Sequence, residues 1–433
     1  MDWTSTRDAA VRVPFLEAVV ANLPGDGGLF VPARLAPFAD VDALLALGWR
    51  ERNEEILVRL LGDELARAEV AALADSAFDF PVPLVRVEEG HAALELFHGP
   101  SLSFKDFGVR FLARVLGLLA GRSGDGAMRT VLTATSGDTG AAVVHAFHRQ
   151  PGFRVAVLYP SGRIAARQER QMATLGGNVR AFAVAGAFDD CQRLVKEAFA
   201  DEALARELGL VSANSINVAR LLAQVLYYFE GVAALRRESP SAPPPVVCVP
   251  SGNFGNLCAG LIARRLALPL GALALATNAN VTVPEYLASG EYRPRPSLAT
   301  LSNAMDVGAP NNWERVAWLA GGDLARLRGE LRWGSAADAE TLAEIAWLAV
   351  LGYRADPHGA VASAVLRRLR APGESGLFVA TAHPAKFDAT ADGAPLPPAL
   401  AEAMARPLLA EPLAADGAAL RAALRTGWTS EKE

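Results

Sequence analysis

The sequence is poor in cysteine and has no surplus of basic charge. Its three cysteines, Cys191, Cys248 and Cys258, form no Cys-x-x-Cys pair, so no disulfide framework is expected. The net charge is −5, which argues against a nucleic-acid or anionic-membrane partner. No charge-free apolar run reaches membrane-spanning length, and the charged N-terminal residues lack the apolar core of a signal peptide. These absences predict a soluble, cytoplasmic protein.

Lysine is also scarce. Only four of the 42 basic residues are lysines, and these are Lys105, Lys196, Lys386 and Lys432. Arginine stays protonated and cannot act as an amine nucleophile. A lysine kept in such a chain is therefore a candidate for chemistry that arginine cannot do. Lys196 lies in a helix-like stretch and Lys432 in a polar tail, which leaves Lys105 and Lys386 as the two of interest.

Two prolines, Pro81 and Pro83, mark a boundary in the chain. Because 433 residues are too many for one ordinary core, we expect a first domain at 1–80 and a second at 81–433. In the second domain short apolar runs alternate with helix-forming stretches, which predicts α/β architecture with mostly parallel sheets. The runs expected to form strands are 84–87, 92–97, 130–134, 155–159, 179–184, 246–249, 273–277 and 377–381.

The first two of these runs flank a Glu-Glu-Gly turn and are expected to form a hairpin. Helices are expected to begin near residues 141 and 257 and to span 313–330 and 335–352. The alanine-rich tail after Pro397 shows no clear pattern.

The first chemically suggestive segment is 98–108, in which a Gly-Pro turn leads to Lys105 between two phenylalanines. An amine that attacks an aldehyde must be neutral part of the time, and burial among apolar groups lowers the pKa of a lysine. The alternative is a surface lysine paired with Asp106. On this segment alone the surface alternative is the more common outcome.

The second segment, 133–140, lies between a predicted strand and a predicted helix and contains Thr135, Ser136, Asp138 and Thr139. Hydroxyls and free backbone N–H groups at the start of a helix suit a carboxylate or a phosphate. The alternative is an ordinary N-cap, in which one side chain satisfies the helix itself. A cap needs only one such residue, so four polar residues and two glycines favour an anion site.

The third segment is 250–256, again between a predicted strand and a predicted helix, with Gly252 and Gly255 in it. Glycines let the backbone approach a ligand closely, and the helix dipole favours an anion. The segment lacks the Gly-Lys-Ser/Thr ending of a P-loop and the spacing of a dinucleotide-binding turn. A small phosphate-bearing cofactor therefore fits better than ATP or NAD, although a plain tight turn has the same pattern.

Two further segments carry polar groups near a helix start or a strand end. Asn214, Ser215 and Arg220 could hold a second anion, and a capped helix with an exposed arginine is an equally good reading. Segment 381–387 contains Thr381, His383 and Lys386. No metal-binding spacing occurs and no metal is expected, and the nucleophile turn of a serine hydrolase is missing.

In their order along the chain, these segments resemble those of threonine synthases, which are fold-type II pyridoxal-phosphate enzymes. The resemblance covers nearly the whole chain, and the ordered set is far more specific than any one motif. The segments that carry it are 5–7, 26–32, 104–108, 135–140, 214–217, 251–256, 305–308, 356–360 and 381–387. Segment 162–166 departs from the family, with Gly-Arg-Ile-Ala-Ala in place of the usual Gly-Lys-Ile-Ser-Pro, and Ser101 and Ser103 replace the commoner threonine and alanine.

The resemblance implies a role for each matching residue. Lys105 corresponds to the Schiff-base lysine, Thr381 to the hydroxyl partner of the pyridine nitrogen, and Asp138 lies near the cofactor's ring oxygen. The cradle for the cofactor phosphate corresponds to Gly252, Asn253, Phe254, Gly255 and Asn256. The loop from Thr135 through Ser136 to Thr139 corresponds to the substrate carboxylate site. The residues that match the substrate phosphate pocket are Thr139, Asn214, Ser215 and Arg220.

The resemblance also implies a fold and a reaction. The fold is that of the tryptophan synthase β-like enzymes, with two α/β lobes, roughly 105–190 in the smaller one, and a separate N-terminal domain. The reaction converts O-phospho-L-homoserine and water to L-threonine and phosphate by γ-elimination and β-addition, the last step of threonine biosynthesis. The alternatives are a threonine or serine dehydratase of the same fold and a non-catalytic ligand-binding descendant. A monomer without an obligatory protein partner is expected. Lys386 falls in a family motif without an assigned role.

Overall fold

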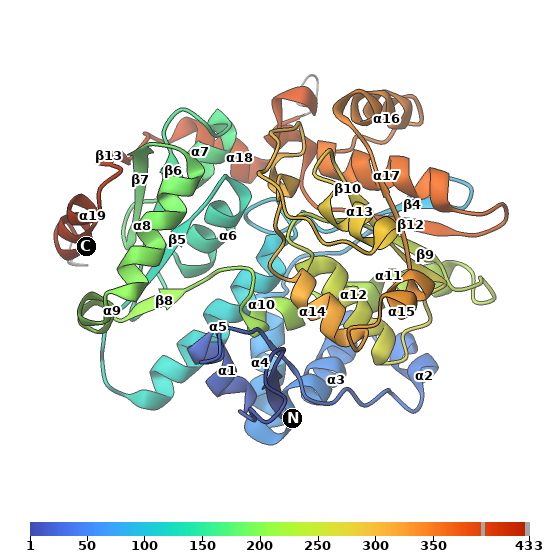
Figure 1. The fold of residues 1–433 in the computed structure, drawn as a ribbon, viewed down its shortest axis with the longest axis horizontal. Coiled ribbons are helices and arrows are strands. Elements are labelled where there is room, and N and C mark those ends of the chain that lie inside the picture. The colour runs from blue at the N-terminus through green and yellow to red at the C-terminus, as the bar shows by residue number, and fades with distance from the viewer. Residues whose placement is uncertain (391–394, 429–433) are drawn as a thin grey trace.

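The computed structural model describes residues 1–390 and 395–428 (Figure 1). It contains a two-stranded, a five-stranded and a six-stranded sheet. In Figure 1 the two large sheets lie side by side, each with its own helices, and the N-terminal residues pack beneath them. This arrangement agrees with the predicted α/β fold with two lobes.

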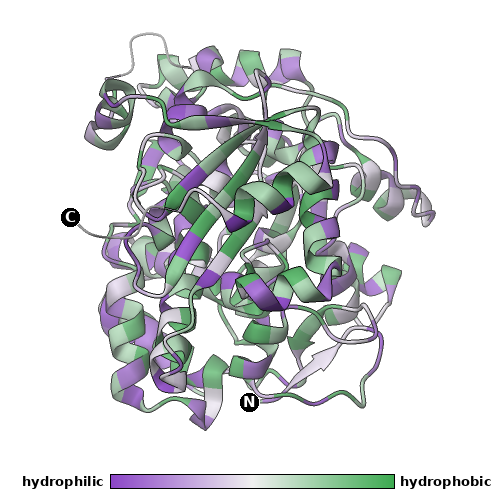
Figure 2. Cartoon of the chain, turned by 90° about the vertical axis from the view of Figure 1, so that its left-hand side faces the viewer, coloured by the Kyte–Doolittle hydropathy of each residue, from purple (hydrophilic) through white to green (hydrophobic). Residues whose placement is uncertain are grey.

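The five-stranded sheet has the order β13-β7-β6-β5-β8, and all of its neighbouring strands are parallel. Its strands are β5 (Arg129–Ala134), β6 (Phe153–Pro160), β7 (Val179–Ala185), β8 (Leu210–Ser212) and β13 (Ala410–Ala414). Residues 155–159 in the middle strand are completely buried because helices cover both faces of the sheet. Figure 2, which views this lobe, shows long hydrophobic stretches on the strands and mixed colouring on the helices around them.

The six-stranded sheet has the order β11-β10-β9-β12-β4-β3. Its strands are β3 (Leu84–Glu88), β4 (His91–Glu95), β9 (Val246–Pro250), β10 (Ala272–Thr277), β11 (Leu331–Ser335) and β12 (Gly376–Ala380). Only the β3–β4 pair is antiparallel, which confirms the predicted hairpin. Because β4 pairs with β12, this sheet combines strands that lie almost 300 residues apart in the sequence.

Most helices cover the faces of these two sheets or lie between them. The helices before β9 are α5 (Lys105–Ser123), α6 (Asp138–Phe147), α7 (Ala166–Met172), α8 (Phe188–Ala200), α9 (Glu202–Leu208), α10 (Val218–Ala223) and α11 (Val225–Glu238). The later ones are α12 (Gly255–Arg265), α13 (Thr282–Ser289), α14 (Trp313–Leu319), α15 (Leu324–Glu330), α16 (Asp338–Val350), α17 (Pro357–Leu369), α18 (Pro398–Ala405) and α19 (Gly417–Arg425). Within the described residues one stretch, Val218–Glu238, is long and apolar enough to cross a membrane, but its apolar 18-residue window is completely buried inside the fold.

Two parts of the chain differ from the sequence prediction. The helix expected at 313–330 is broken into α14 and α15 at Gly321 and Gly322, which both adopt a φ of +72° that continues no helix. The tail after Pro397 contains α18, β13 and α19, and β13 joins the five-stranded sheet. Its Ala-Glu-Pro-Leu-Ala sequence lacks β-branched residues, so the strand depends on its partner β7 for its conformation.

The first part of the chain forms β1 (Trp3–Ser5), α1 (Phe15–Ala21), β2 (Phe30–Pro32), α2 (Val41–Ala46), α3 (Trp49–Leu61) and α4 (Arg67–Ala77). It shares a hydrophobic core with α5, α10 and α11. A buried ion pair crosses this contact, between the guanidinium of Arg52 on α3 and the carboxylate of Glu230 on α11. Burial lowers the pKa of Arg52 to about 10, so the arginine is still charged at neutral pH.

Glu230→Ala is therefore expected to lower the free energy of unfolding by about 3 kcal/mol, because it leaves the buried Arg52 cation without its partner. Denaturation in urea, followed by circular dichroism, measures the loss. The control is Asp75→Asn, which breaks the exposed pair between Asp75 on α4 and Arg50 on α3 and is expected to change the midpoint only slightly. Equal losses of unfolding free energy in the two variants would contradict a special contribution of the buried Arg52–Glu230 pair to stability.

Candidate functional site

The predicted site residues gather where strands of both large sheets end. Loop 135–137 follows β5, loop 251–254 follows β9, and Thr381 follows β12. Carboxyl ends of parallel strands share one edge of a sheet, which is the usual place for a ligand in such folds. Two backbone hydrogen bonds join this edge to the start of α5. The N–H of Phe104 donates to Thr381 O at 2.8 Å, and the N–H of His383 donates to Leu102 O at 3.0 Å. Lys105 therefore lies next to Thr381.

The Lys105 side chain is almost buried, with 12% of it exposed. Its Nζ lies 3.3 Å from Asp138 Oδ2 and 4.8 Å from the centre of the Phe104 ring. Burial lowers the pKa of Lys105, while the nearby Asp138 carboxylate acts in the opposite direction. The surface pair with Asp106 does not form, because Asp106 is itself buried and accepts a hydrogen bond from the Ser101 N–H at 2.9 Å. The amine thus has the environment that a nucleophilic lysine needs.

Loop 251–256 is shaped as an anion cradle at the start of α12. In the part of the chain that the structure describes, the backbone N–H groups of residues 252–256 donate to no protein acceptor. Phe254 has a φ of +62°, a strained left-handed conformation that helps the N–H groups to converge. Asn256 accepts from the hydroxyls of Tyr227 and Tyr228 at 2.6 and 2.7 Å, which leaves its buried Nδ2 without a partner. Free donors at a helix N-terminus fit a phosphate.

The loop after β5 holds its shape through Thr135. The Thr135 hydroxyl oxygen accepts from the N–H groups of Gly137 and Gly140 at 2.9 and 2.8 Å, so this side chain is engaged within the loop itself. The backbone N–H groups of Ser136, Asp138 and Thr139 donate to no acceptor among the described residues. Loop 135–139 therefore presents backbone donors, while the Thr135 hydroxyl supports their arrangement.

A second anion-binding arrangement surrounds Arg220 on α10. Its side chain is buried, its Nη1 donates to Ala213 O at 2.8 Å, and its Nε has no partner. Among the described residues no carboxylate pairs with it, and burial lowers its pKa to about 10, so it stays charged at neutral pH. The neighbouring Ser215 Oγ accepts from Asn253 Nδ2 at 2.6 Å, which ties this loop to the loop after β9. Asn214, by contrast, uses its side-chain oxygen locally, to accept from the Ile216 N–H.

Several residues in the site were not assigned by sequence reasoning. Lys386 is completely buried and bonds to Asp138, and Gln168 Nε2 also donates to Asp138 at 3.0 Å. His358 Nδ1 is 2.6 Å from Asp356, and its Nε2 accepts from the Ala304 N–H. The scarcity of lysine had singled out Lys386. His358 falls in segment 356–360, which carries the resemblance, but no role was assigned to it. The contacts of Gln168 with Asp138 and of His358 with Ala304 join distant segments, for which the sequence holds no signal.

The fold and these groups define the class of protein. An almost buried amine, a row of free N–H groups at a helix N-terminus and the Thr381 hydroxyl fit a cofactor with an aldehyde, a phosphate and a ring nitrogen. In agreement, the model of the pyridoxal-phosphate dependent enzyme family matches residues 80–381. The cofactor is therefore pyridoxal phosphate, and the protein is an enzyme.

Comparison with known proteins identifies the family. The model of the threonine synthase N terminus matches residues 2–78. Threonine synthase from Haemophilus influenzae is 48% identical, over 95% of this chain and 97% of its own length. The crystal structure of threonine synthase from Escherichia coli has a TM-score of 0.91 at 46% identity, covering 98% of this chain and 99% of that one. That of the pyridoxal-phosphate-bound threonine synthase from Brucella melitensis also has a TM-score of 0.91, at 34% identity and the same coverage. The chain belongs to the threonine synthase family.

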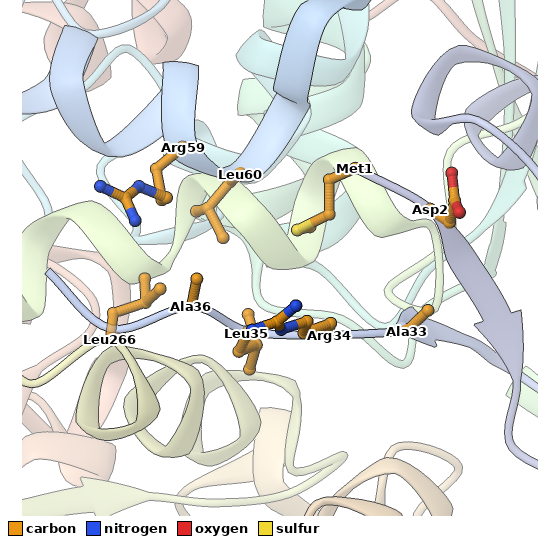
Figure 3. A pocket seen from close by; sticks show the side chains of 9 residues that line it. All are labelled: Met1, Asp2, Ala33, Arg34, Leu35, Ala36, Arg59, Leu60 and Leu266. Atoms are coloured by element: carbon orange, nitrogen blue, oxygen red, sulfur yellow. The ribbon is translucent and has the colours of Figure 1, made fainter.

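A cavity of about 480 Å³ lies away from this site, between the N-terminal residues and the end of α12 (Figure 3). Its lining consists of Met1, Asp2, Ala33, Arg34, Leu35, Ala36, Arg59, Leu60 and Leu266. None of the predicted site residues belongs to this lining.

The role of loop 251–256 as the cradle for the cofactor phosphate can be tested directly. A Cβ on Gly252 would lie 2.7 Å from Met305 Cα and 2.8 Å from Ala304 O, which are backbone atoms that cannot rotate away. Gly252→Ala is therefore expected to displace the loop and raise the dissociation constant of pyridoxal phosphate about tenfold or more. Titration of the apoprotein, followed by absorbance, measures the constant.

Two other glycine variants serve as comparisons for Gly252→Ala. A Cβ on Gly255 meets nothing closer than Asn312 Nδ2 at 3.4 Å, so Gly255→Ala is expected to weaken binding less. Gly121→Ala on α5 meets nothing within 4 Å and is expected to leave binding unchanged. Equal losses in all three variants would argue against a steric cause.

Proposed function

We propose that the protein converts O-phospho-L-homoserine and water to L-threonine and phosphate, the last step of threonine biosynthesis. The observation that carries this proposal is Arg220, a buried cation without a carboxylate partner among the described residues. A buried charge is costly unless it is paired, so this position favours a ligand that brings an anion. A second anion site, separate from the cradle of the cofactor phosphate, suits a substrate that carries a phosphate of its own.

We assign the cofactor contacts as follows. Lys105 Nζ would link to the cofactor's aldehyde carbon, the N–H groups of 252–256 would hold its phosphate, and the Thr381 hydroxyl would be the partner of the ring nitrogen. Asp138 would lie on the side of the ring oxygen. When bound, pyridoxal phosphate would withdraw electrons from the substrate carbons next to the amino group. A neutral hydroxyl at the ring nitrogen, in place of a carboxylate, would moderate this withdrawal.

The substrate contacts come from the other two loops. The N–H groups of Ser136 and its neighbours in loop 135–139 bind the substrate carboxylate, and the substrate phosphate lies against Thr139, Asn214, Ser215 and Arg220. The bond from Cγ to the phosphate oxygen breaks, the hydroxyl group of water adds at Cβ, and Cγ ends as a methyl group. Lys105 would move the protons at Cα and Cβ, and its burial favours the neutral form that this requires.

We propose the first 80 residues as a separate domain. This domain contacts residues 214–217, the loop that precedes α10 and Arg220. Asn217 Nδ2 donates to Val19 O at 2.9 Å. The buried Arg315 donates to Phe30 O at 2.9 Å and to Ile216 O at 2.6 Å, and so joins the domain to the loop. These bonds support a positioning role for the N-terminal domain. Cytoplasmic location and independence from an obligatory protein partner complete the proposal.

The reaction itself is tested by assaying the purified holoenzyme with O-phospho-L-homoserine. Equal amounts of phosphate and threonine are expected, with no keto acid formed from threonine. Lys105→Ala is the inactive control, because it lacks the amine. Keto-acid formation from threonine as the main activity would point to a dehydratase instead. The solved threonine deaminase from Solanum lycopersicum shares only the fold at 17% identity.

The second anion site is tested by Arg220→Ala. Loss of a charge-assisted contact with the substrate phosphate is expected to raise KM for O-phospho-L-homoserine about tenfold to a hundredfold. The affinity for pyridoxal phosphate, measured in parallel, is expected to stay within about twofold because the cradle is separate. Arg206→Ala, at an exposed position on α9, is the control that should change neither value. A loss of cofactor affinity as large as the change in KM would contradict two separate anion sites.

A further inference from the structure

Lys386 is a second buried lysine in the site, and the proposed reaction leaves it without a role. It ends the short 3-10 turn Pro384–Lys386, directly after the segment that pairs with the start of α5. Its side chain is 0% exposed. Its Nζ donates to Ser101 O at 2.8 Å and lies 2.7 Å from Asp138 Oδ1. The fully enclosed ammonium therefore has one carboxylate partner, and that partner is Asp138.

Asp138 is consequently shared between two lysines. Lys386 contacts Oδ1 at 2.7 Å, whereas Lys105 contacts Oδ2 at the longer distance of 3.3 Å. Burial acts to raise the pKa of Asp138, but the charges of Lys386 and Lys105 outweigh it and hold this pKa well below its ordinary value. The carboxylate is therefore ionised throughout the working range of pH. One negative charge serves two ammonium groups, and the closer one is Lys386.

Other charged groups also face this cluster. Arg220 on α10 adds a further positive charge near Lys105, and His358 on α17 faces Asp138. Burial raises the pKa of Asp106 on α5 to about 6, so this carboxylate is largely ionised at pH 7. Asp106 binds the Ser101 N–H, while Ser101 O binds Lys386. Gln168 Nε2 also donates to Asp138 Oδ1, at 3.0 Å, but it is neutral. Among the described residues, Lys386 is therefore the only cation in contact with Asp138 Oδ1.

We propose that Lys386 is a positioning residue that neutralises and fixes Asp138, so that Lys105 has only a shared counter-ion and gives up its proton more readily. The proposal rests on the proposed function, in which Lys105 carries the cofactor. A lysine suits this position better than the arginine that this chain otherwise prefers. A compact ammonium fits a completely enclosed site between one carbonyl and one carboxylate oxygen, whereas a guanidinium needs more room and more acceptors.

Removal of the Lys386 charge acts on Lys105 in one direction. The ammonium of Lys386 repels that of Lys105, so its loss stabilises protonated Lys105. Asp138, relieved of its closer partner, can then pair fully with Lys105, which also favours the protonated form. Both effects raise the pKa of the Lys105 nitrogen.

The test is the pH dependence of cofactor absorbance in Lys386→Met holoenzyme. The midpoint for the Lys105-linked cofactor is expected to rise by about one pH unit or more relative to wild type. The acidic limb of kcat/KM should shift in the same direction, so that activity lost at pH 7 is partly regained at higher pH. Lys196→Met, at an exposed position on α8, is the matched control and should show the wild-type midpoint. Wild-type values for both the spectrum and the kcat/KM limb in Lys386→Met would overturn the proposal.

Replacement of the partner carboxylate decides between the outcomes if Lys386→Met fails to fold. Asp138→Asn removes the shared counter-ion and is expected to lower the midpoint, and an unchanged midpoint there would overturn the proposal. In the Asp138→Asn background, Lys386→Met should have a smaller effect than in wild type, a non-additivity that a purely structural role would not produce.

One control separates this inference from the proposed function. Borohydride reduction of wild-type holoenzyme, followed by peptide mapping, is expected to label Lys105 alone. A label on another lysine would refute the site assignment itself. A label on Lys105 together with an unchanged midpoint and kcat/KM limb in Lys386→Met would refute only the role of Lys386.

Discussion

The short backbone pairing between residues 102–104 and 381–383 is the constraint on which the site depends. It includes an isolated antiparallel bridge between Ser103 and Ala382. The pairing fixes the start of α5 against the end of β12. The position of Lys105 is therefore set by the six-stranded sheet. Asp138 reaches the same amine from the five-stranded sheet. The chemistry is thus assembled between two separately built lobes, and the orientation of Lys105 follows from main-chain hydrogen bonds that no side-chain substitution removes directly.

The parts of the fold and site that are local in sequence could be predicted. Buried parallel strands are continuous apolar runs, and loops that bind anions concentrate glycine and small polar residues, so 135–140 and 251–256 stand out in the sequence. Contacts between distant segments could not be predicted in this way. The bond from Lys386 to Asp138 and the pairing of β13 with β7 each join residues more than 200 positions apart in the sequence. Thr135 shows a further limit of prediction from sequence. A threonine at this position is compatible both with a hydroxyl that supports the loop and with one that faces a ligand, and in the structure it supports the loop.

Buried arginines serve two different purposes in this chain. Arg315 donates to two backbone carbonyls and to Asn312 Oδ1. Arg52 pairs with Glu230 and donates to two backbone carbonyls, so each of these arginines has three acceptors in the protein, although Arg52 Nε has none. Arg220 has a single carbonyl acceptor and an unpartnered Nε. Where the protein satisfies the guanidinium the residue supports the structure, and where it does not the residue is available to an anion. Residue type and burial alone do not distinguish a structural arginine from one that can bind an anion. The number of hydrogen-bond acceptors around the guanidinium does.

The sheet order has a consequence for the synthesis of the chain. Strand β4 (His91–Glu95) pairs with β12 (Gly376–Ala380), and β7 gains its outer neighbour only from β13 (Ala410–Ala414). A ribosome therefore completes most of the protein while both sheets still have open edges, and such edges readily pair with other chains. Neither lobe can close before the last fifth of the sequence has left the ribosome. The nascent protein is thus open to pairing with other chains for most of its synthesis.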